Sequence, residues 1–321
     1  MKQILSIILT CSLLATAFPV ILGMCLHQSI ETSPSSLAAE QHNSSTTITF
    51  FDTKTNTLVK SELEEYLVGV LAAEMPASYE EEALKAQAVA ARSYILSKLS
   101  KENPDHPQAT VCTNAAHCKG YLAENDAKQK WSERDRNNYW QKLESAVSST
   151  KGVYMICEEA VVEAFFFSSG GGRTENSEDV WQESRPYLRS VESPDPPENN
   201  TSTAVFTKEE FFALLNPHLR TRLSSSSAVA VSDIRLTDGG SVATITLCGK
   251  EFKGTEIRSI FNLKSANFTL VSDNNKVIFN VTGHGHGVGM SQKGANQMAK
   301  DGKKYTEILS HYYTNIQIVK L

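Results

Sequence analysis

Several residues of this sequence are of types that can do chemistry, and the first is Glu74, in the segment AAEMP. The surrounding pattern places this glutamate at the C-terminal end of a helix, among apolar neighbours. The helix dipole and the loss of water both disfavour a negative charge there, which raises the pKa of a carboxyl group. A carboxyl group that keeps its proton can protonate the departing oxygen of a glycosidic bond. The alternative is a solvated glutamate at a helix end.

A second group consists of Cys112, His117 and Cys118, three candidate metal ligands within seven residues. Zinc binds cysteine and histidine tetrahedrally, and three protein ligands leave one position for water or a carboxylate. A disulfide between Cys112 and Cys118 is the alternative in an exported protein. The adjacent His117 favours a Zn²⁺ site over the disulfide.

Two glycine-rich segments also carry polar side chains. The first, SSGGGRT, begins at Ser168 directly after an apolar run. Glycines allow a ligand to approach the backbone and hydroxyl groups suit sugar recognition, although a plain flexible turn is the alternative. The second, GHGHGVG, presents His284 and His286 on a tight backbone after a predicted strand. Such imidazoles can bind a metal, hydrogen-bond a glycan or brace the fold through the backbone.

Helices are predicted around Glu74. Ser61 has the spacing of a capping box, and the apolar residues after it predict a helix that Pro76 ends. A second helix is predicted over residues 79–99, with one alanine-rich buried stripe. On this helix Lys85 is four residues after Glu81, which is a common surface ion pair. A further helix is predicted over residues 132–148.

From residue 152 onward the apolar residues alternate with period two, which is typical of strands. The α+β fold expected here has a helical segment carrying Glu74 packed on a β-rich domain. We expect a catalytic domain over residues 47–321, mainly helical over 47–150 and β-rich over 151–321. Strands are predicted at residues 153–156, 161–167, 229–236, 242–247, 268–271, 277–281 and 316–319.

The bulk composition limits the classes of partner. At 321 residues the chain can bury a substantial core. Its formal net charge of −5 leaves no excess of lysine and arginine to neutralise phosphates, which argues against nucleic acid. Any contact with an acidic polymer must therefore be local.

An uncharged run over residues 4–26 follows Lys2. A stretch of about 20 apolar residues is long enough to span a bilayer, and the lysine favours a cytoplasmic N-terminus. We therefore expect a transmembrane anchor over residues 1–27, a polar tether over 28–46 and a single-pass protein of the cell membrane with its catalytic domain outside the cytoplasm. A cleaved signal peptide is the alternative, because residues 15–17 resemble a cleavage site.

The motifs together resemble the stage II sporulation protein D family, lytic transglycosylases of endospore-forming bacteria, from about residue 66 to the C-terminus. The resemblance implies that Glu74 is the catalytic acid and base, and that Lys85, Thr174 and Tyr187 bind glycan. Some members carry zinc near the catalytic glutamate, which agrees with the cysteine and histidine cluster. The segments that carry the resemblance are GVLAAEMPASYEEEALKAQAVAARSY, FFSSGGGRTENSEDVW, RPYLRSV and GHGHGVGMSQKGA.

The family's reaction cleaves the β-1,4 bond between N-acetylmuramic acid and N-acetylglucosamine without adding water, leaving a 1,6-anhydro end. Its preferred substrate, peptidoglycan glycan strands without stem peptides, implies a partner amidase, stage II sporulation protein P, and a membrane scaffold protein. The process implied is engulfment of the forespore, with the protein in the mother-cell membrane facing the septum. The alternatives are a zinc-dependent cell-wall amidase or peptidase and a non-catalytic, glycan-binding amidase activator.

Overall fold

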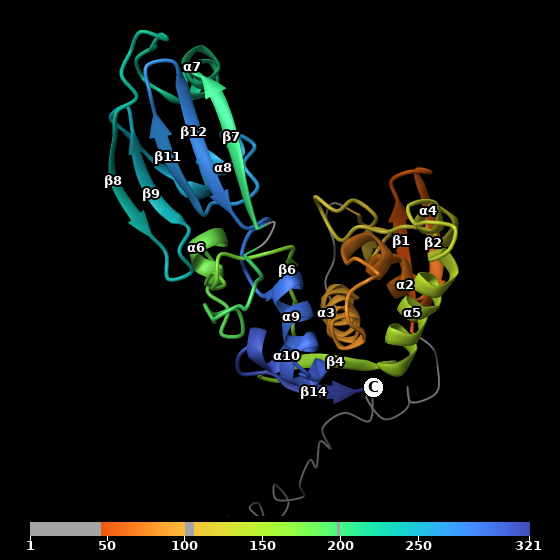
Figure 1. The fold of residues 1–321 in the computed structure, drawn as a ribbon. Helices are drawn as coiled ribbons and strands as arrows, with labels where there is room; N and C mark the ends of the chain where they lie inside the picture. The colour runs from red at the N-terminus through yellow and green to blue at the C-terminus, as the bar shows by residue number, and fades with distance from the viewer. Residues whose placement is uncertain (1–45, 100–105, 198–199) are drawn as a thin grey trace, which may run out of the picture. The chain divides into compact units, whose positions relative to one another are not determined.

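The computed structural model describes residues 46–99, 106–197 and 200–321 (Figure 1). Over these residues it combines helices with five small sheets, so the predicted α+β class is confirmed. Buried apolar side chains form two clusters. The first cluster runs from Ile48 to Tyr313 and so includes residues on both sides of position 150. The boundary expected there stays a prediction.

The first sheet fixes the position of Cys112. Strands β1 (Thr47–Asp52) and β2 (Thr57–Glu62) form an antiparallel hairpin, because Ile48 and Phe50 alternate with polar residues and are buried. Strand β3 (Val111–Cys112) runs parallel to β1 and pairs Cys112 with Phe51. The loop that follows β3 is thereby anchored beside the hairpin.

Helix α2 (Leu63–Glu74) ends at the predicted catalytic residue. The predicted capping box is wrong, because Ser61 is paired within β2 and Glu62, which precedes the helix, makes no side-chain cap. The helix ends as predicted, since Pro76 cannot continue it. Its last turn closes through the N–H of Met75, which donates to the Leu71 carbonyl at 3.0 Å.

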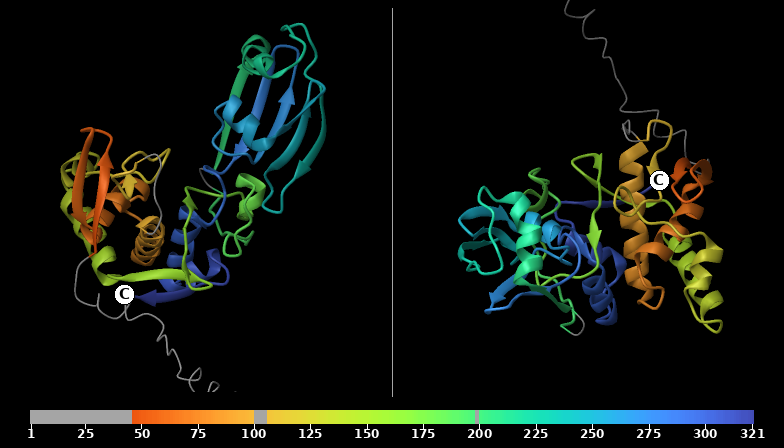
Figure 2. Two further views of the ribbon diagram at one scale, coloured as in Figure 1. Left: turned by 180° about the vertical axis from the view of Figure 1, so that it is seen from behind. Right: turned by 90° about the horizontal axis from the view of Figure 1, so that it is seen from above.

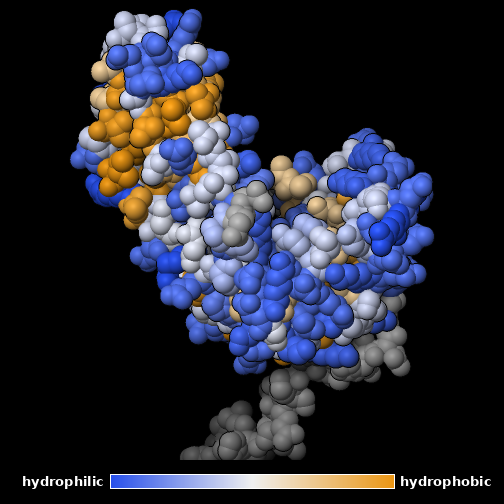
Figure 3. Space-filling model, viewed as in Figure 1, coloured by the Kyte–Doolittle hydropathy of each residue, from blue (hydrophilic) through white to orange (hydrophobic). Residues whose placement is uncertain are grey.

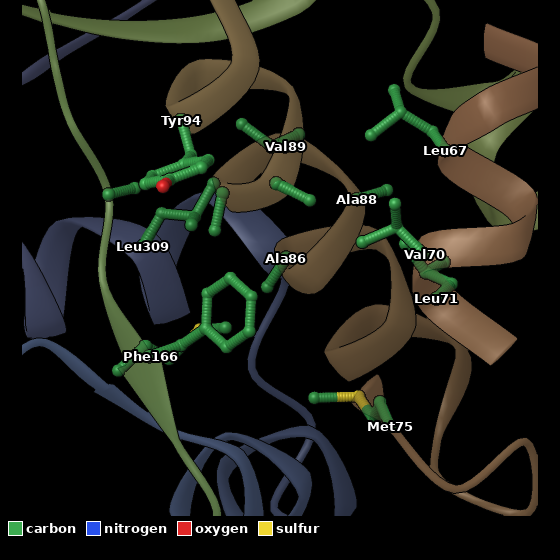
Figure 4. Packing of buried hydrophobic residues seen from close by; sticks show 14 of the residues in the cluster. Leu67, Val70, Leu71, Met75, Ala86, Ala88, Val89, Tyr94, Phe166 and Leu309 are labelled. Carbon is green, nitrogen blue, oxygen red and sulfur yellow. The ribbon is translucent and has the colours of Figure 1, made fainter. Parts of the chain in front are cut away.

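Helix α3 (Glu81–Leu99) lies at the centre of the first cluster and is buried on several sides rather than along one stripe. Helices α2 and α5 (Arg136–Ser149) contact it, as do β4 (Val153–Cys157), α9 (Gln292–Lys300) and α10 (Tyr305–Tyr312). Its alanines allow these neighbours to approach closely. Figure 4 shows side chains of α2 on one side of α3, with Phe166 and Leu309 on the other.

Arg92 lies fully buried on α3 and joins three elements. Its guanidinium donates to both carboxylate oxygens of Glu64 on α2, at 2.9 and 2.6 Å, and to the Val153 carbonyl at 2.9 Å. A buried charge is stable only when it is paired in this way.

The strand predicted at residues 161–167 is wrong, because the segment contributes two short strands to different sheets. β5 (Ala160–Val161) pairs with β4, which also pairs with β14 (Gln317–Lys320), whereas β6 (Phe166–Phe167) runs parallel to β13 (Met290–Ser291). The break occurs at buried Glu163, whose carboxylate pairs with Lys98 and, at 2.7 Å, with Arg185. Two further short helices are α4 (Glu124–Gln129), between β3 and α5, and α6 (Ser177–Trp181), between β6 and the next strand of the chain.

The second cluster is formed by residues 201–282 and contains six buried phenylalanines around two three-stranded sheets, ordered β11-β12-β7 and β10-β9-β8 (Figures 1 and 2). Figure 3 shows apolar side chains also at the surface of this part. Strand β10 and helix α8 were not predicted. The elements are β7 (Thr201–Thr207), α7 (Lys208–Leu215), a short 3₁₀ helix (Asn216–His218), β8 (Val231–Leu236), β9 (Val242–Leu247), β10 (Lys250–Lys253), α8 (Gly254–Ile260), β11 (Phe268–Ser272) and β12 (Lys276–Thr282).

The predicted location in the cell membrane needs correction. Across the parts of the chain that the structure describes, every helix is too short or too polar to cross a bilayer. This finding overturns the prediction of a single-pass membrane protein. The predicted anchor, residues 1–27, and the predicted tether up to residue 45 lie outside the described residues.

Candidate active site

A cavity of about 650 Å³ brings together segments that are far apart in the sequence. Its walls come from the end of α2, the loop after β3, strand β6 and the turn before β13. Five of the predicted site residues line it: Glu74, Cys118, Ser168, His284 and His286. Other lining residues are Tyr79, Lys119, Trp131, Phe166, Phe167 and Gln292.

Glu74 presents its carboxylate to this cavity from the last residue of α2. Its Oε1 accepts a hydrogen bond of 2.6 Å from the backbone N–H of Gly120. Burial raises the pKa of Glu74 above its ordinary value, and this effect outweighs the opposing influence of Lys119 and of that N–H. A side chain at position 120 would crowd the carboxylate, because a Cβ there would lie 3.2 Å from Oε1. Glycine thus lets the loop approach the acid.

Lys119 supplies a buried positive charge next to Glu74. Its ammonium group lies 3.9 Å from the ring centroid of Phe166 and 4.5 Å from that of Tyr94. Burial lowers the pKa of Lys119 to about 8, although Glu74 and Glu163 act in the opposite direction. The site therefore combines a carboxyl group whose pKa is raised by burial with a cation that partly offsets this effect.

The alternating glycines near His286 are required by close packing against β6. Gly285 and Gly289 have φ angles of 121° and 78°, which side chains rarely allow. A Cβ at Gly289 would lie 2.1 Å from the Phe165 carbonyl oxygen, and one at Gly285 would lie 2.7 Å from the Cβ of Phe167. The backbone of this segment is thereby held against the wall of the cavity.

The two imidazoles of this segment are in different settings. His286 is partly buried, and its Nδ1 accepts the N–H of Val288 at 3.1 Å. Burial, together with Lys119 and Arg258, lowers the pKa of His286 to about 3, so this ring is neutral. His284 is exposed, and its pKa is also lowered, by partial burial and by nearby cations. A neutral imidazole can both donate and accept hydrogen bonds, so the exposed His284 suits sugar hydroxyls. His286 already hydrogen-bonds the backbone of Val288 and Phe166.

The candidate metal ligands form a compact cluster that includes a fourth residue. His106, Cys112, His117 and Cys118 place one ligand atom each within 4.8 Å of one another. The His117 Nδ1 lies 3.5 Å from the sulfur of Cys112 and 3.3 Å from that of Cys118. Around a tetrahedral zinc ion, sulfur at about 2.3 Å and nitrogen at about 2.05 Å would be separated by about 3.6 Å. The donor set and its spacing therefore fit zinc.

The alternative disulfide is not formed, since Cys112 and Cys118 are both free thiols. Burial raises the pKa of the Cys118 thiol to about 11. Two adjacent thiolates are unfavourable in such a setting unless a cation binds them. The cluster leads directly into the Glu74 site, because Lys119 and Gly120 follow Cys118 in the same loop.

Three predicted glycan-binding residues do not line the cavity. Lys85 pairs with Glu81 at 2.7 Å, as expected from its spacing, and with Glu82 at 3.0 Å. Thr174 is fully buried, and its hydroxyl donates to the Arg189 carbonyl and accepts the N–H of Val191. The hydroxyl of Tyr187, a partly buried residue, accepts from Arg185 at 3.3 Å. Their predicted role in binding glycan stays a prediction.

Sequence reasoning missed His106, Lys119 and Gly120. A signal for His106 existed, because it precedes Cys112 by six residues in the same polar loop. No pattern pointed to Lys119 or Gly120, whose importance comes from the loop folding back onto the end of α2.

Comparisons with known proteins show to which family the chain belongs. The stage II sporulation protein D of Bacillus subtilis (strain 168) is 36% identical to it over 293 residues, which cover 90% of this chain and 84% of that protein. The chain belongs to the stage II sporulation protein D family. The protein of the same name from Bacillus amyloliquefaciens is 37% identical over 259 residues, covering 80% of this chain and 74% of the relative. A family model described as Stage II sporulation protein matches residues 52–156.

A more distant relative is the amidase enhancer of Bacillus subtilis (strain 168), 28% identical over 298 residues, which cover 77% of this chain and 39% of that protein. Members of the stage II sporulation protein D family take part in sporulation, and a role at the cell wall is consistent with both names. The segment matched by the family model contains Glu74, Lys119 and the four candidate metal ligands.

Proposed function

We propose that this protein is a lytic transglycosylase that cleaves peptidoglycan glycan strands between N-acetylmuramic acid and N-acetylglucosamine, with Glu74 as acid and base. The main support is that, of the described residues lining the cavity, Glu74 alone carries a carboxyl group. Glycoside hydrolases ordinarily need two carboxyl groups, one on each side of the bond. A reaction in which the substrate supplies its own nucleophile needs one.

In the proposed reaction, protonated Glu74 donates its proton to the bridging oxygen as the bond to C1 of the muramic acid residue breaks. The resulting carboxylate then removes the proton from the C6 hydroxyl of the same sugar. The C6 oxygen closes on C1 and forms the 1,6-anhydro ring, so no water is consumed. Burial favours the protonated carboxyl before the first step, and Lys119 and the Gly120 N–H stabilise the carboxylate between the steps.

The proposed zinc ion would be held by His106, Cys112, His117 and Cys118. Four protein ligands complete a tetrahedral site and leave no position for water, which is typical of structural zinc. The ion would supply folding energy and hold the loop that carries Lys119 and Gly120. This closed ligand set argues against the alternative of a zinc-dependent amidase or peptidase.

The proposed substrate is glycan from which stem peptides have been removed, during engulfment of the forespore. An amidase of the same process would supply it, by cutting the bond between the muramic lactyl group and the peptide. Similarity to a protein named amidase enhancer supports a partner of this class. It also keeps a non-catalytic activator as the second candidate function.

Product analysis by mass spectrometry separates these candidates. The purified full-length chain is incubated with peptide-free glycan strands and, separately, with intact sacculi. Muropeptides one water lighter than the hydrolysis product, with anhydro-muramic ends, are the expected result. Free stem peptides would show an amidase, and unchanged glycan with stimulation of an added amidase would show an activator. Either result would overturn the proposed reaction.

A further inference from the structure

A second cavity, of about 430 Å³, adjoins the one that contains Glu74. One wall comes from the end of α6, at Val180 and Trp181, and the other from α8 and the residues after it. His286 lines both cavities, so they meet at one imidazole ring.

The aromatic wall of this cavity is Trp181. It is 38% exposed, although large apolar side chains are usually buried. Its ring is held by Phe165 and His286, at centroid distances of 4.6 and 4.9 Å. A fixed aromatic ring that remains partly open to the cavity provides a flat apolar surface, on which the C–H face of a sugar can stack.

The opposite wall carries Arg258, a half-buried residue on α8. Its Nε donates to the Leu263 carbonyl at 3.4 Å. Within the described parts of the chain it forms no ion pair with a carboxylate. Burial lowers the pKa of Arg258, but a guanidinium keeps its charge in proteins. A positive charge in this setting, with most of its N–H donors unused, favours an anionic ligand.

Other cations reinforce this charge. Arg258 and Lys264 both lower the pKa of His284, after partial burial, and Arg258 acts in the same direction on His286. Arg258 therefore brings a positive charge to the wall of the second cavity, near His286, although the whole chain has a net charge of −5. A local positive charge suits a sugar chain that is uncharged except for widely spaced carboxylates.

We propose that the second cavity is a subsite for an N-acetylmuramic acid residue without a stem peptide. Trp181 stacks on its ring, and Arg258 pairs with its lactyl carboxylate. The proposal rests on the function proposed above. In peptidoglycan the stem peptide is attached to this carboxyl group by an amide bond, so the free carboxylate exists only after the peptide has been removed. Arg258 would thus distinguish stripped strands from intact ones.

The test measures binding of the full-length Glu74→Gln chain, which keeps the glycan uncut, to two probes. One is peptide-free glycan, and the other is the same glycan with its lactyl carboxylates converted to methylamides. We expect Arg258→Gln to weaken binding of the carboxylate glycan about tenfold and to leave binding of the amide glycan unchanged. Arg222→Gln, an exposed arginine away from the cavity, is the matched control and should change neither. Trp181→Ala should weaken both.

If Arg258→Gln does not fold, the Glu74→Gln chain with Arg258 unaltered must still bind the carboxylate glycan about tenfold more tightly than the amide glycan. Equal loss for both probes, or equal loss with Arg222→Gln, would overturn the subsite. Competition by poly(glycerol phosphate) as strong as by glycan would also overturn it, in favour of a phosphate polymer. Cleavage is measured separately with unaltered Glu74. Cleavage without any discrimination by Arg258 refutes the subsite alone, whereas discriminating binding without cleavage refutes the proposed reaction alone.

Discussion

Replacement of His106 by alanine is expected to abolish stable zinc binding. The residue completes the proposed set of four ligands, in which every ligand atom lies within 4.8 Å of the others. Its ring stacks on Phe51 at 5.5 Å and meets His117 edge-on at 4.9 Å. These contacts hold the imidazole in place before any metal binds. Replacement of His106 therefore removes a ligand that is already positioned for the metal.

The magnitude follows from linkage between metal binding and folding. Zinc at 100 times its dissociation constant adds about 2.7 kcal/mol to the free energy of unfolding. For a domain of more than about 150 residues, each kcal/mol corresponds to about 2–4 °C in melting temperature. The unaltered protein should therefore melt about 5–10 °C higher with zinc than with chelator. His106→Ala should lose most of this increment.

The assay combines metal analysis of the dialysed protein with melting curves in zinc and in chelator. His218→Ala, at an exposed position in the second cluster region, is the control and should retain one zinc per chain. Equal zinc content in His106→Ala and the unaltered protein would refute the four-ligand site. So would a zinc-independent melting temperature of the unaltered protein.

Three further results are expected. Replacement of Glu163 by glutamine should cost about 3 kcal/mol in urea unfolding, because the buried carboxylate that pairs with two partly buried cations is lost. Burial raises the pKa of Glu163, but the two cations lower it overall, so the stability that the ion pairs provide is lost as the pH falls through the lowered pKa. A destabilisation by Glu163→Gln that persists in acid would contradict the reasoning. Arg92→Met should cost about 3–5 kcal/mol, and adding Glu64→Gln should recover part of it; no recovery argues against the pair. Because burial raises the pKa of Glu74 and the reaction needs its protonated form, kcat/KM should fall as the pH rises through a value above 4.5. A fall in kcat/KM centred at or below pH 4.5 would contradict the effect of burial on this carboxyl group.

The sequence predicted the helices around Glu74 well, because local signals define them. The apolar spacing before Pro76 and the alanine-rich segment after it are sufficient to place α2 and α3. Long-range packing was not predictable in the same way. Helix α3 shows one apolar stripe in its sequence, yet it is buried on several sides, because α9 and α10 return from the far end of the chain.

The candidate site illustrates the same limit. Glu74 and the glycine–histidine segment were each recognisable, but nothing in the sequence shows that they share one cavity. The strand predicted at residues 161–167 looked continuous because six of its seven residues are apolar. In the structure it is broken between β5 and β6, where buried Glu163 forms two ion pairs. His106 was missed because a single histidine in a polar loop resembles many others. Its role depends on β3 pairing with β1, which is a tertiary contact.

The central claim concerns the carboxyl group of Glu74, and the most direct test is the rate at which anhydro-muramic ends form on peptide-free strands. Glutamine at this position keeps the size of the side chain but cannot supply the proton. We predict that Glu74→Gln slows end formation by about 10²–10⁴-fold while the affinity for glycan remains measurable. Formation of anhydro ends at the unaltered rate would contradict the account.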